Sequence, residues 1–233
     1  MQKIGLFGGT FNPVHLGHLS IACEVRERLS LDSVIFIPTG TPPHKVKTDL
    51  IAPEHRLRMV ELAIAPYGFF TASSIETERK GLSYSIDTVT ALKKEMGEET
   101  EFYFIIGIDA FVEINTWKNA DELLTMCNFV VIPRPGHRFA DLKNVHIPLI
   151  KKLPADELGK IDSGETSSLS FPLSGNYYLL LEKITLCDIS STELRKLIRD
   201  GQEVKNLLPD SVMSYIMRQR LYLIDKKENI TKR

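Results

Sequence analysis

Two histidines, His15 and His18, stand three positions apart shortly after the run Gly8-Gly9-Thr10. Residues three apart share one face of a helix, so both imidazoles can point at one ligand. The free backbone N–H groups at the start of a helix, together with the positive end of its dipole, favour an anion such as phosphate. A phosphoryl or nucleotidyl group in transfer carries negative charge on its equatorial oxygens, and histidine can donate hydrogen bonds and carry charge near neutral pH. The pair therefore predicts phosphate chemistry rather than two ordinary residues at a helix start.

A strand, a turn and a helix must position these histidines. Ile4, Leu6 and Phe7 form a short apolar run that indicates a buried strand, and the two glycines after it end that strand. Over residues 16–29 apolar residues recur at helical spacing, with charged residues on the other side. The histidines therefore lie at the first turn of the expected helix.

Short apolar strands alternate with helical patterns along the rest of the chain. The expected strands cover residues 33–38, 69–75, 102–106, 129–132 and 177–186. One expected helix is capped by Ser83 or Ser85 and ends at Met96, and another covers residues 210–221. This alternation predicts an α/β fold, a doubly wound parallel sheet with helices on both faces and a C-terminal helical portion. In such a sheet the loops at the carboxyl ends of the strands line the ligand crevice.

Residues 54–65 form a further expected helix. Leu57, Val60 and Ile64 lie near one stripe of it, with Glu61 beside them. Arg56 and Arg58 are expected to be surface charge.

Composition limits the class of protein. Of the 233 residues 43 % are apolar and 25 % charged, which is typical of an ordinary globular domain, and the net charge is −1. A general nucleic-acid binder is usually basic overall, so no nucleic-acid partner is expected. No stretch reaches the length of a transmembrane helix and the N-terminus lacks a signal-peptide pattern, so no membrane partner is expected.

The cysteines point to a reducing compartment. Cys23, Cys127 and Cys187 are odd in number and include no Cys-x-x-Cys pair, which argues against a disulfide framework or a zinc knuckle. We therefore expect a cytoplasmic protein.

We expect one domain over residues 1–223, followed by a charged tail over residues 224–233. Residues 137–175 are the least regular part, and the serine-rich segment 163–170 indicates a flexible loop. The alternatives for residues 137–175 are an insertion, an oligomer contact and disorder, so a homo-oligomer stays open.

Further candidate binding residues follow the expected strands. His44 and Lys45 lie in a loop after the second strand, where they either meet a second phosphate or form a solvated basic loop. Gly107 permits close backbone approach after the fourth strand, and Asp109 can either accept from ribose hydroxyls or cap the next helix. Arg134 follows the fifth strand, and its planar fork suits phosphate or carboxylate.

A second helix start also favours an anion. Ser190 with Glu193 three positions later is a capping-box pattern, and Gly201 ends the helix at the usual glycine position. Thr192 and Arg195 add a hydroxyl and a cation to the same helix start. Two separate helix N-termini are explained if a long polyphosphate lies between them, and the alternative is a well-capped amphipathic helix.

Residues 8–18, Gly-Gly-Thr-Phe-Asn-Pro-Val-His-Leu-Gly-His, resemble the signature of the His-x-Gly-His nucleotidyltransferase superfamily. Within it they are most similar to the bacterial nicotinate-nucleotide adenylyltransferases. Later segments agree in order, and the resemblance fades over residues 137–175. It implies a Rossmann-like sheet of the nucleotidyltransferase type. It also implies transfer of AMP from ATP to nicotinate mononucleotide, giving deamido-NAD and pyrophosphate, with Mg²⁺ bound through the ATP phosphates and no metal ligands on the protein.

The resemblance also implies roles for individual residues. The catalytic residues would be His15 and His18. ATP would be bound by both histidines and by Gly8, Gly9, Thr10, Phe11, Gly107, Asp109, Ser190, Thr192 and Arg195. The mononucleotide would be bound by His44, Lys45, Ser85, Trp117 and Arg134. Ser85 departs from the threonine that the family often has at this place, and Trp117 either stacks on the nicotinate ring or packs in the core.

Three alternatives stay open. The preference for nicotinate over nicotinamide mononucleotide rests on resemblance alone. Another His-x-Gly-His transferase, using phosphopantetheine or a cytidylyl acceptor, is disfavoured by the segments around Trp117 and Arg134. A non-catalytic dinucleotide sensor is disfavoured because the early glycines lack the Gly-x-Gly-x-x-Gly spacing and no acidic residue ends the second strand near Pro38.

Overall fold

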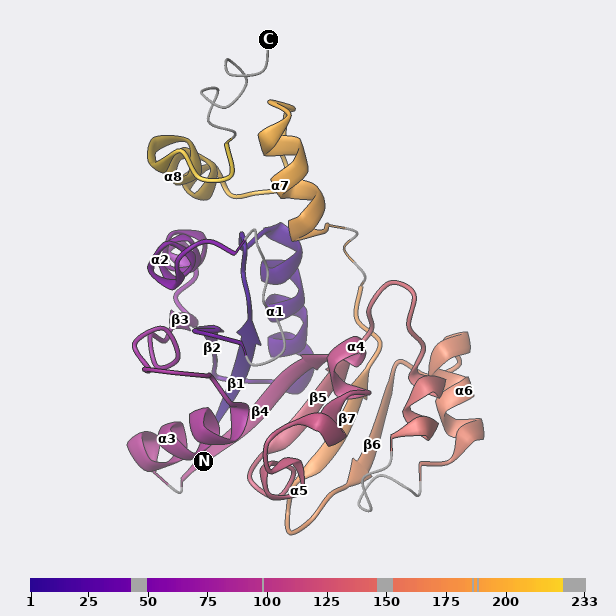
Figure 1. The fold of residues 1–233 in the computed structure, drawn as a ribbon. Coiled ribbons are helices and arrows are strands. Elements are labelled where there is room, and N and C mark those ends of the chain that lie inside the picture. Colours follow the sequence, from indigo (N-terminus) through magenta and orange to yellow (C-terminus); the bar gives the residue numbers. More distant parts are fainter. Residues whose placement is uncertain (43–49, 98, 146–152, 186, 188, 224–233) are drawn as a thin grey trace.

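A computed structural model describes residues 1–42, 50–97, 99–145, 153–185, 187 and 189–223 of the chain. Its centre is a seven-stranded sheet in the order β3-β2-β1-β4-β5-β7-β6 (Figure 1). The strands are β1 (Gln2–Gly9), β2 (Ser33–Pro38), β3 (Phe70–Ala72), β4 (Thr100–Gly107), β5 (Asn128–Ile132), β6 (Ser168–Pro172) and β7 (Tyr178–Glu182). All neighbouring pairs are parallel except β6 and β7, which are antiparallel.

Helices cover both faces of this sheet (Figure 1). One face packs against α1 (Leu16–Leu29), α2 (Pro53–Ile64), α7 (Ser191–Arg199) and α8 (Asp210–Gln219). The other face packs against α3 (Ser85–Met96), α4 (Ile108–Phe111), η1 (Ile114–Thr116), α5 (Ala120–Leu123), η2 (Phe139–Asn144) and α6 (Ala155–Ser163). The expected doubly wound parallel sheet is confirmed, and so is the helical C-terminal portion of the chain, which consists of α7 and α8.

Alternation along each strand divides the core into two layers. In β4, Phe102 and Phe104 face one layer, whereas Tyr103 and Ile105 face the other. Both layers are closed by helices, so the central strands are apolar on both faces rather than alternating with polar residues. The short continuous apolar runs of the sequence follow from this double coverage.

Three local expectations are wrong. The third strand covers only Phe70–Ala72, because it pairs with β2 over three residues. Tyr84, with extended backbone angles, is the N-cap of α3, and Ser85 is already its first helical residue. The segment 163–170 is not a loop throughout, because β6 begins at Ser168 and pairs with β7.

The buried stripe of α2 differs from the expected one. Arg56 is 0 % exposed and lies on the stripe with Met59, Val60 and Ala63, while Leu57 is only partly buried. The expectation that Arg56 is surface charge is therefore wrong. Arg58 is on the surface as expected and pairs with Glu61 at 2.8 Å.

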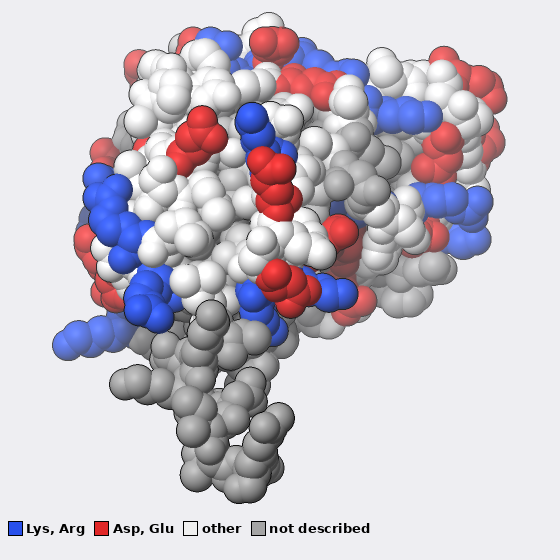
Figure 2. All heavy atoms as spheres, turned by 90° about the horizontal axis from the view of Figure 1, so that it is seen from above, with Lys and Arg blue, Asp and Glu red and all other residues white. Residues whose placement is uncertain are grey.

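The surface carries both signs of charge. Basic and acidic side chains alternate over the face seen in Figure 2. Within the part of the chain that the structure describes, no helix combines the length and the apolar character needed to cross a membrane.

Candidate active site

A cavity of about 1160 Å³ opens at the carboxyl ends of the parallel strands. The ends of β1 and β4 contribute Phe7, Gly8 and Gly9 on one side and Ile106 and Gly107 on the other. The chain leaves β1 towards β2 and leaves β4 towards β5, in opposite directions along the sheet. The cavity therefore lies at the switch point of the topology, where open α/β sheets bind ligands.

The turn between β1 and α1 is compact. The ring of Phe11 folds back over Gly9, where an added Cβ would lie 2.9 Å from the ring edge. The same ring meets the His18 imidazole edge-on, with centroids 5.0 Å apart, and is 2 % exposed. Phe11 has a φ of 46°, in the left-handed region that bulky residues rarely adopt. The glycine is required because the turn brings an aromatic ring against the backbone.

His15 and His18 lie against each other at the start of α1. Their ring centroids are 3.7 Å apart, with the planes tilted by 34°. The backbone N–H of His15, the N-cap residue, donates to Nδ1 of His18 at 3.2 Å. Because His18 Nδ1 accepts this bond, the proton of the neutral ring is on Nε2. His18 thus keeps one N–H donor, and both rings line the cavity.

Burial favours the neutral form of both histidines. Desolvation, followed by the charge of Arg134, lowers the pKa of His15 to about 3. Desolvation likewise lowers the pKa of His18 well below its ordinary value, with further contributions from His15 and Arg134. This lowering of the pKa runs against the expectation of charged imidazoles near neutral pH. A bound anion would have to supply the charge that favours their protonation.

The N-terminus of α7 meets the glycine turn directly. Ser191 Oγ donates to the Pro13 carbonyl at 2.9 Å, and Arg195 Nη1 donates to the Asn12 carbonyl at 2.8 Å. These bonds place the first turn of α7 beside the first turn of α1. The N–H groups of Ser191, Thr192 and Glu193 at the start of α7 make no backbone hydrogen bond within the described part of the chain. At the start of α1, Leu16 N–H donates to the Leu207 carbonyl at 3.0 Å and His18 N–H donates to the His15 carbonyl at 2.9 Å, so α7 offers the cavity more free amides than α1 does.

The details at α7 differ from the expected capping box. Ser190 is the N-cap, but its side chain makes no capping hydrogen bond. Arg195 is 7 % exposed, and its Nη2 donates to Thr192 Oγ1 at 3.4 Å. Its Nε is buried without a hydrogen-bond partner. Gly201, with a φ of 68°, follows the helix as expected.

The ends of β4 and β5 contribute an acid and a base. Arg134 Nε lies 3.6 Å from Asp109 Oδ1. A Cβ on Gly107 would lie 2.7 Å from Arg134 Nε, so the glycine leaves room for this pair. Gly107 is the N-cap of α4, and Asp109 lies in its first turn. The alternative of Asp109 as a helix cap is therefore wrong.

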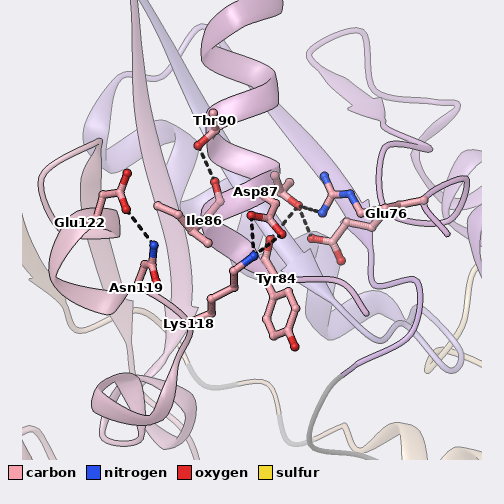
Figure 3. A network of polar contacts seen from close by, with 10 residues as sticks. Glu76, Tyr84, Ile86, Asp87, Thr90, Lys118, Asn119 and Glu122 are labelled. Atoms are coloured by element: carbon pink, nitrogen blue, oxygen red, sulfur yellow. Dashed lines mark hydrogen bonds and ion pairs between the residues drawn. The ribbon is translucent and has the colours of Figure 1, made fainter. Parts of the chain in front are cut away.

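A polar network around α3 (Figure 3) includes the cavity residues Glu76, Tyr84, Thr88 and Lys118. Lys118 Nζ contacts both carboxylate oxygens of Asp87 at 3.1 Å and lies 4.7 Å from the centre of the Tyr84 ring. Thr88 Oγ1 donates to the buried carboxylate of Glu76 at 2.8 Å. Burial raises the pKa of Glu76 despite that bond.

Trp117 takes part in both the core and the cavity. It packs edge-on against Phe104, with centroids 6.2 Å apart, and it also lines the cavity. Core packing and a place beside a ligand are therefore compatible for this residue.

Every candidate residue that the structure describes lines this one cavity: Gly8, Gly9, Thr10, Phe11, His15, His18, Ser85, Gly107, Asp109, Trp117, Arg134, Ser190, Thr192 and Arg195. His44 and Lys45 lie outside the described residues. Sequence reasoning missed Glu76 and Lys118, for which no motif gave a signal. Thr88 was not among the candidate residues, although it ends the segment Ser83-Tyr-Ser-Ile-Asp-Thr88, which resembles a family segment beside the pyridine ring. It also missed Arg56 behind the cavity wall, although its spacing from Met59, Val60 and Ala63 places it on the buried stripe of α2.

Comparison with known proteins identifies the family. A family model described as cytidylyltransferase-like matches residues 6–197. The chain belongs to the cytidylyltransferase-like family. Two curated members, from Thermoanaerobacter sp. (strain X514) and Geotalea daltonii, are each 43 % identical to this chain. The alignments cover 98 % and 95 % of this chain and 98 % of each relative, and both are named “Probable nicotinate-nucleotide adenylyltransferase”.

A solved structure shares the fold of this family member. The Plasmodium falciparum nicotinic acid mononucleotide adenylyltransferase complexed with NaAD aligns with a TM-score of 0.67 at 20 % identity. The alignment covers 95 % of this chain and 98 % of the Plasmodium chain.

Proposed function

We propose that this protein is a nicotinate-nucleotide adenylyltransferase, an enzyme that transfers AMP from ATP to nicotinate mononucleotide and releases pyrophosphate. One observation carries the proposal: the paired histidines at the start of α1 and the N-terminus of α7 line a single cavity at the switch point of the sheet. The names of the relatives, which are similar over nearly the whole chain, support the same activity.

The 5′-phosphate of the mononucleotide attacks the α-phosphorus of ATP in line. The new P–O bond forms as the bond to the bridging oxygen of pyrophosphate breaks. His15 and His18 would donate to oxygens of the transferring group, and the backbone N–H groups of Thr10 and Phe11 would hold the α-phosphate region. No protein nucleophile is required, because positioning and electrostatic stabilisation dominate this chemistry.

The remaining phosphates find donors on other walls of the cavity. Ser190 and Thr192, with the free amides of the first turn of α7, would hold the β- and γ-phosphates. Arg195 would help to hold the β- and γ-phosphates mainly by fixing the Asn12 carbonyl, to which its Nη1 donates. Its buried Nε has no hydrogen-bond partner among the described residues and could also donate to a phosphate. Arg134 would bind the acceptor phosphate by exchanging its ion pair with Asp109. Lys45 and His44 are proposed for the same phosphate.

The acid form of the mononucleotide suits the far end of the cavity. The amides of Ser85 and Ile86 open α3, and the first intrahelical bonds of that helix are donated by Asp87 and Thr88. Two free N–H groups favour a carboxylate over an amide, and Lys118 would add its charge by exchanging its ion pair with Asp87. Trp117 would flank the pyridine ring.

Mg²⁺ would reach the site on ATP. Among the described residues no group of three or more His, Cys, Asp or Glu side chains could hold a metal ion. Asp109, which pairs with Arg134, is a single carboxylate at the cavity. One carboxylate suits a metal ion that keeps most of its own water ligands better than a site built entirely from protein ligands. When bound, the metal would neutralise phosphate charge.

Three further expectations stay predictions. We expect residues 1–223 to form one domain. We expect the protein to be cytoplasmic, which the free Cys23, Cys127 and Cys187 support. Light scattering would show whether it forms a homo-oligomer.

Pyrophosphate release tests the proposal. With ATP and nicotinate mononucleotide the protein should release pyrophosphate and form deamido-NAD. Nicotinamide mononucleotide should react about 10- to 100-fold less efficiently, because a charge-assisted interaction is lost. His18→Ala should lower kcat on the order of a hundredfold or more. His55→Ala, on α2 outside the cavity, is the matched control.

Three results would contradict the proposal. Binding of nucleotide without pyrophosphate release would make the protein a sensor, and full activity of folded His18→Ala would remove the histidines from catalysis. Turnover with phosphopantetheine in place of the mononucleotide would move it to another transferase.

A further inference from the structure

Arg56 is fully buried, yet it is not among the residues that line the cavity. Its guanidinium donates to three backbone carbonyls: Nη1 to Thr10 at 2.9 Å, Nη2 to Gly40 at 3.1 Å and Nε to Ile51 at 3.2 Å. These carbonyls belong to the turn after β1, the loop after β2 and the segment that leads into α2. One side chain therefore ties the turn after β1 to both ends of the connection between β2 and α2.

The bond to Thr10 has a consequence for the next amide. Carbonyl oxygen and N–H of one planar trans peptide point in opposite directions. The Thr10–Phe11 peptide is trans, since the cis bond of this turn is Asn12–Pro13. Because Arg56 holds the Thr10 carbonyl on the side away from the cavity, the Phe11 N–H points towards it. Among the described residues this N–H has no backbone or side-chain acceptor.

The conformation of this turn needs support. Phe11 adopts a φ of 46°, which phenylalanine rarely does, so contacts around it must hold it there. The ring of Phe11 is held by Phe7 and His18, and the peptide before it is held by Arg56. The side chain and the backbone of the turn are thus fixed from opposite sides.

We infer that Arg56 is a positioning residue, which aims the Phe11 N–H at the phosphate that is transferred. The inference rests on the proposed function. Arg56 touches neither substrate in this scheme, and it acts through the Thr10–Phe11 peptide. Lysine cannot replace it, because an ammonium lacks the planar fork that reaches three carbonyls at once.

Kinetics of Arg56→Lys and Arg56→Met test the inference. We expect kcat to fall about 10- to 100-fold while KM for ATP changes less than about threefold, because an N–H aimed at developing charge acts in the transition state. The matched controls are Arg58→Lys and Arg58→Met on the same helix, at a side chain that is 54 % exposed. They should leave both constants within about twofold of the wild type.

A second measurement uses the wild-type protein. The Phe11 amide resonance should shift and become protected from hydrogen exchange when a non-hydrolysable ATP analogue binds. If the Arg56 variants do not fold, this measurement still tests the contact between the Phe11 amide and the phosphate on which the role of Arg56 depends. In a folded Arg56→Lys variant the shift on binding should be much smaller.

Either of two results would overturn the inference: wild-type kcat in folded Arg56→Lys, or no response of the wild-type Phe11 amide to the analogue. Failure of the proposed function is a separate outcome, because it would appear as a wild-type protein that releases no pyrophosphate.

Discussion

Binding of a dinucleotide should draw protons into the histidine pair. Burial at the cavity lowers the pKa of His15 to about 3, so at pH 6 about one molecule in a thousand has this residue protonated. The diphosphate of deamido-NAD brings negative charge to the same cavity and does not itself titrate near this pH. Protons taken up on binding can therefore be assigned to the protein.

The size of the effect follows from one close charge. A unit charge 4 Å from an imidazolium contributes about 4 kcal/mol at an effective dielectric constant of about 20. Since one pKa unit corresponds to about 1.4 kcal/mol, this moves His15 from about 3 to about 6. We expect uptake of roughly half a proton per site at pH 6, and less at pH 8.

Isothermal titration calorimetry measures this number. The binding enthalpy is compared in two buffers that differ in ionisation enthalpy, and the difference gives the protons taken up. His15→Gln with His18→Gln should abolish the uptake, whereas His137→Gln, which also changes a histidine at the cavity, should keep it. Tight binding of deamido-NAD at pH 6 with equal enthalpies in both buffers would show that the histidines act only as neutral donors.

Two further predictions concern the free energy of unfolding. The folded pKa of His15 is below its unfolded value of about 6.5, so the unfolded chain binds the extra proton and stability is lost as the pH falls from about 6.5 towards 3. The loss should be about 2 kcal/mol at pH 5, measured by urea unfolding against His15→Gln, and equal pH dependence of the two proteins would contradict it. Gly40→Ala should lower the free energy of unfolding by roughly 2 to 3 kcal/mol, because its Cβ would overlap the backbone carbonyl of Glu76. Gly68→Ala, whose Cβ meets nothing within 4 Å, is the control, and equal melting temperatures would refute the clash.

The sequence alone was sufficient to predict the strands that are apolar on both faces. Residues 33–38 and 102–106 are continuous apolar runs, and each is a central strand of the sheet. The glycine turn and its histidines were also predictable, because these residue types at this spacing form a motif that indicates phosphate chemistry. Their neutral state was not, since it depends on burial by parts of the chain remote in sequence.

Two errors show where local patterns mislead. Arg56 was expected at the surface because arginine is rarely buried without partners, and its partners are carbonyls from other loops. The serine-rich segment 163–170 was expected to be a loop, yet Leu169 and Phe171 alternate with polar residues and pack on the core. In both cases the spacing of the buried positions could be found in the sequence. The prediction was wrong because it gave more weight to the residue type, arginine or serine, than to that spacing.

The contacts between α7 and the glycine turn set an order of assembly. His15 and His18 are synthesised early, but Ser191 and Arg195, which hold the Pro13 and Asn12 carbonyls, emerge only after most of the chain. Tyr222 adds a bond to the Asn12 side chain at 2.8 Å later still. A nascent polypeptide that already contains both imidazoles thus lacks the α7 wall of the cavity, which is complete only when residues beyond 190 have docked on the turn after β1.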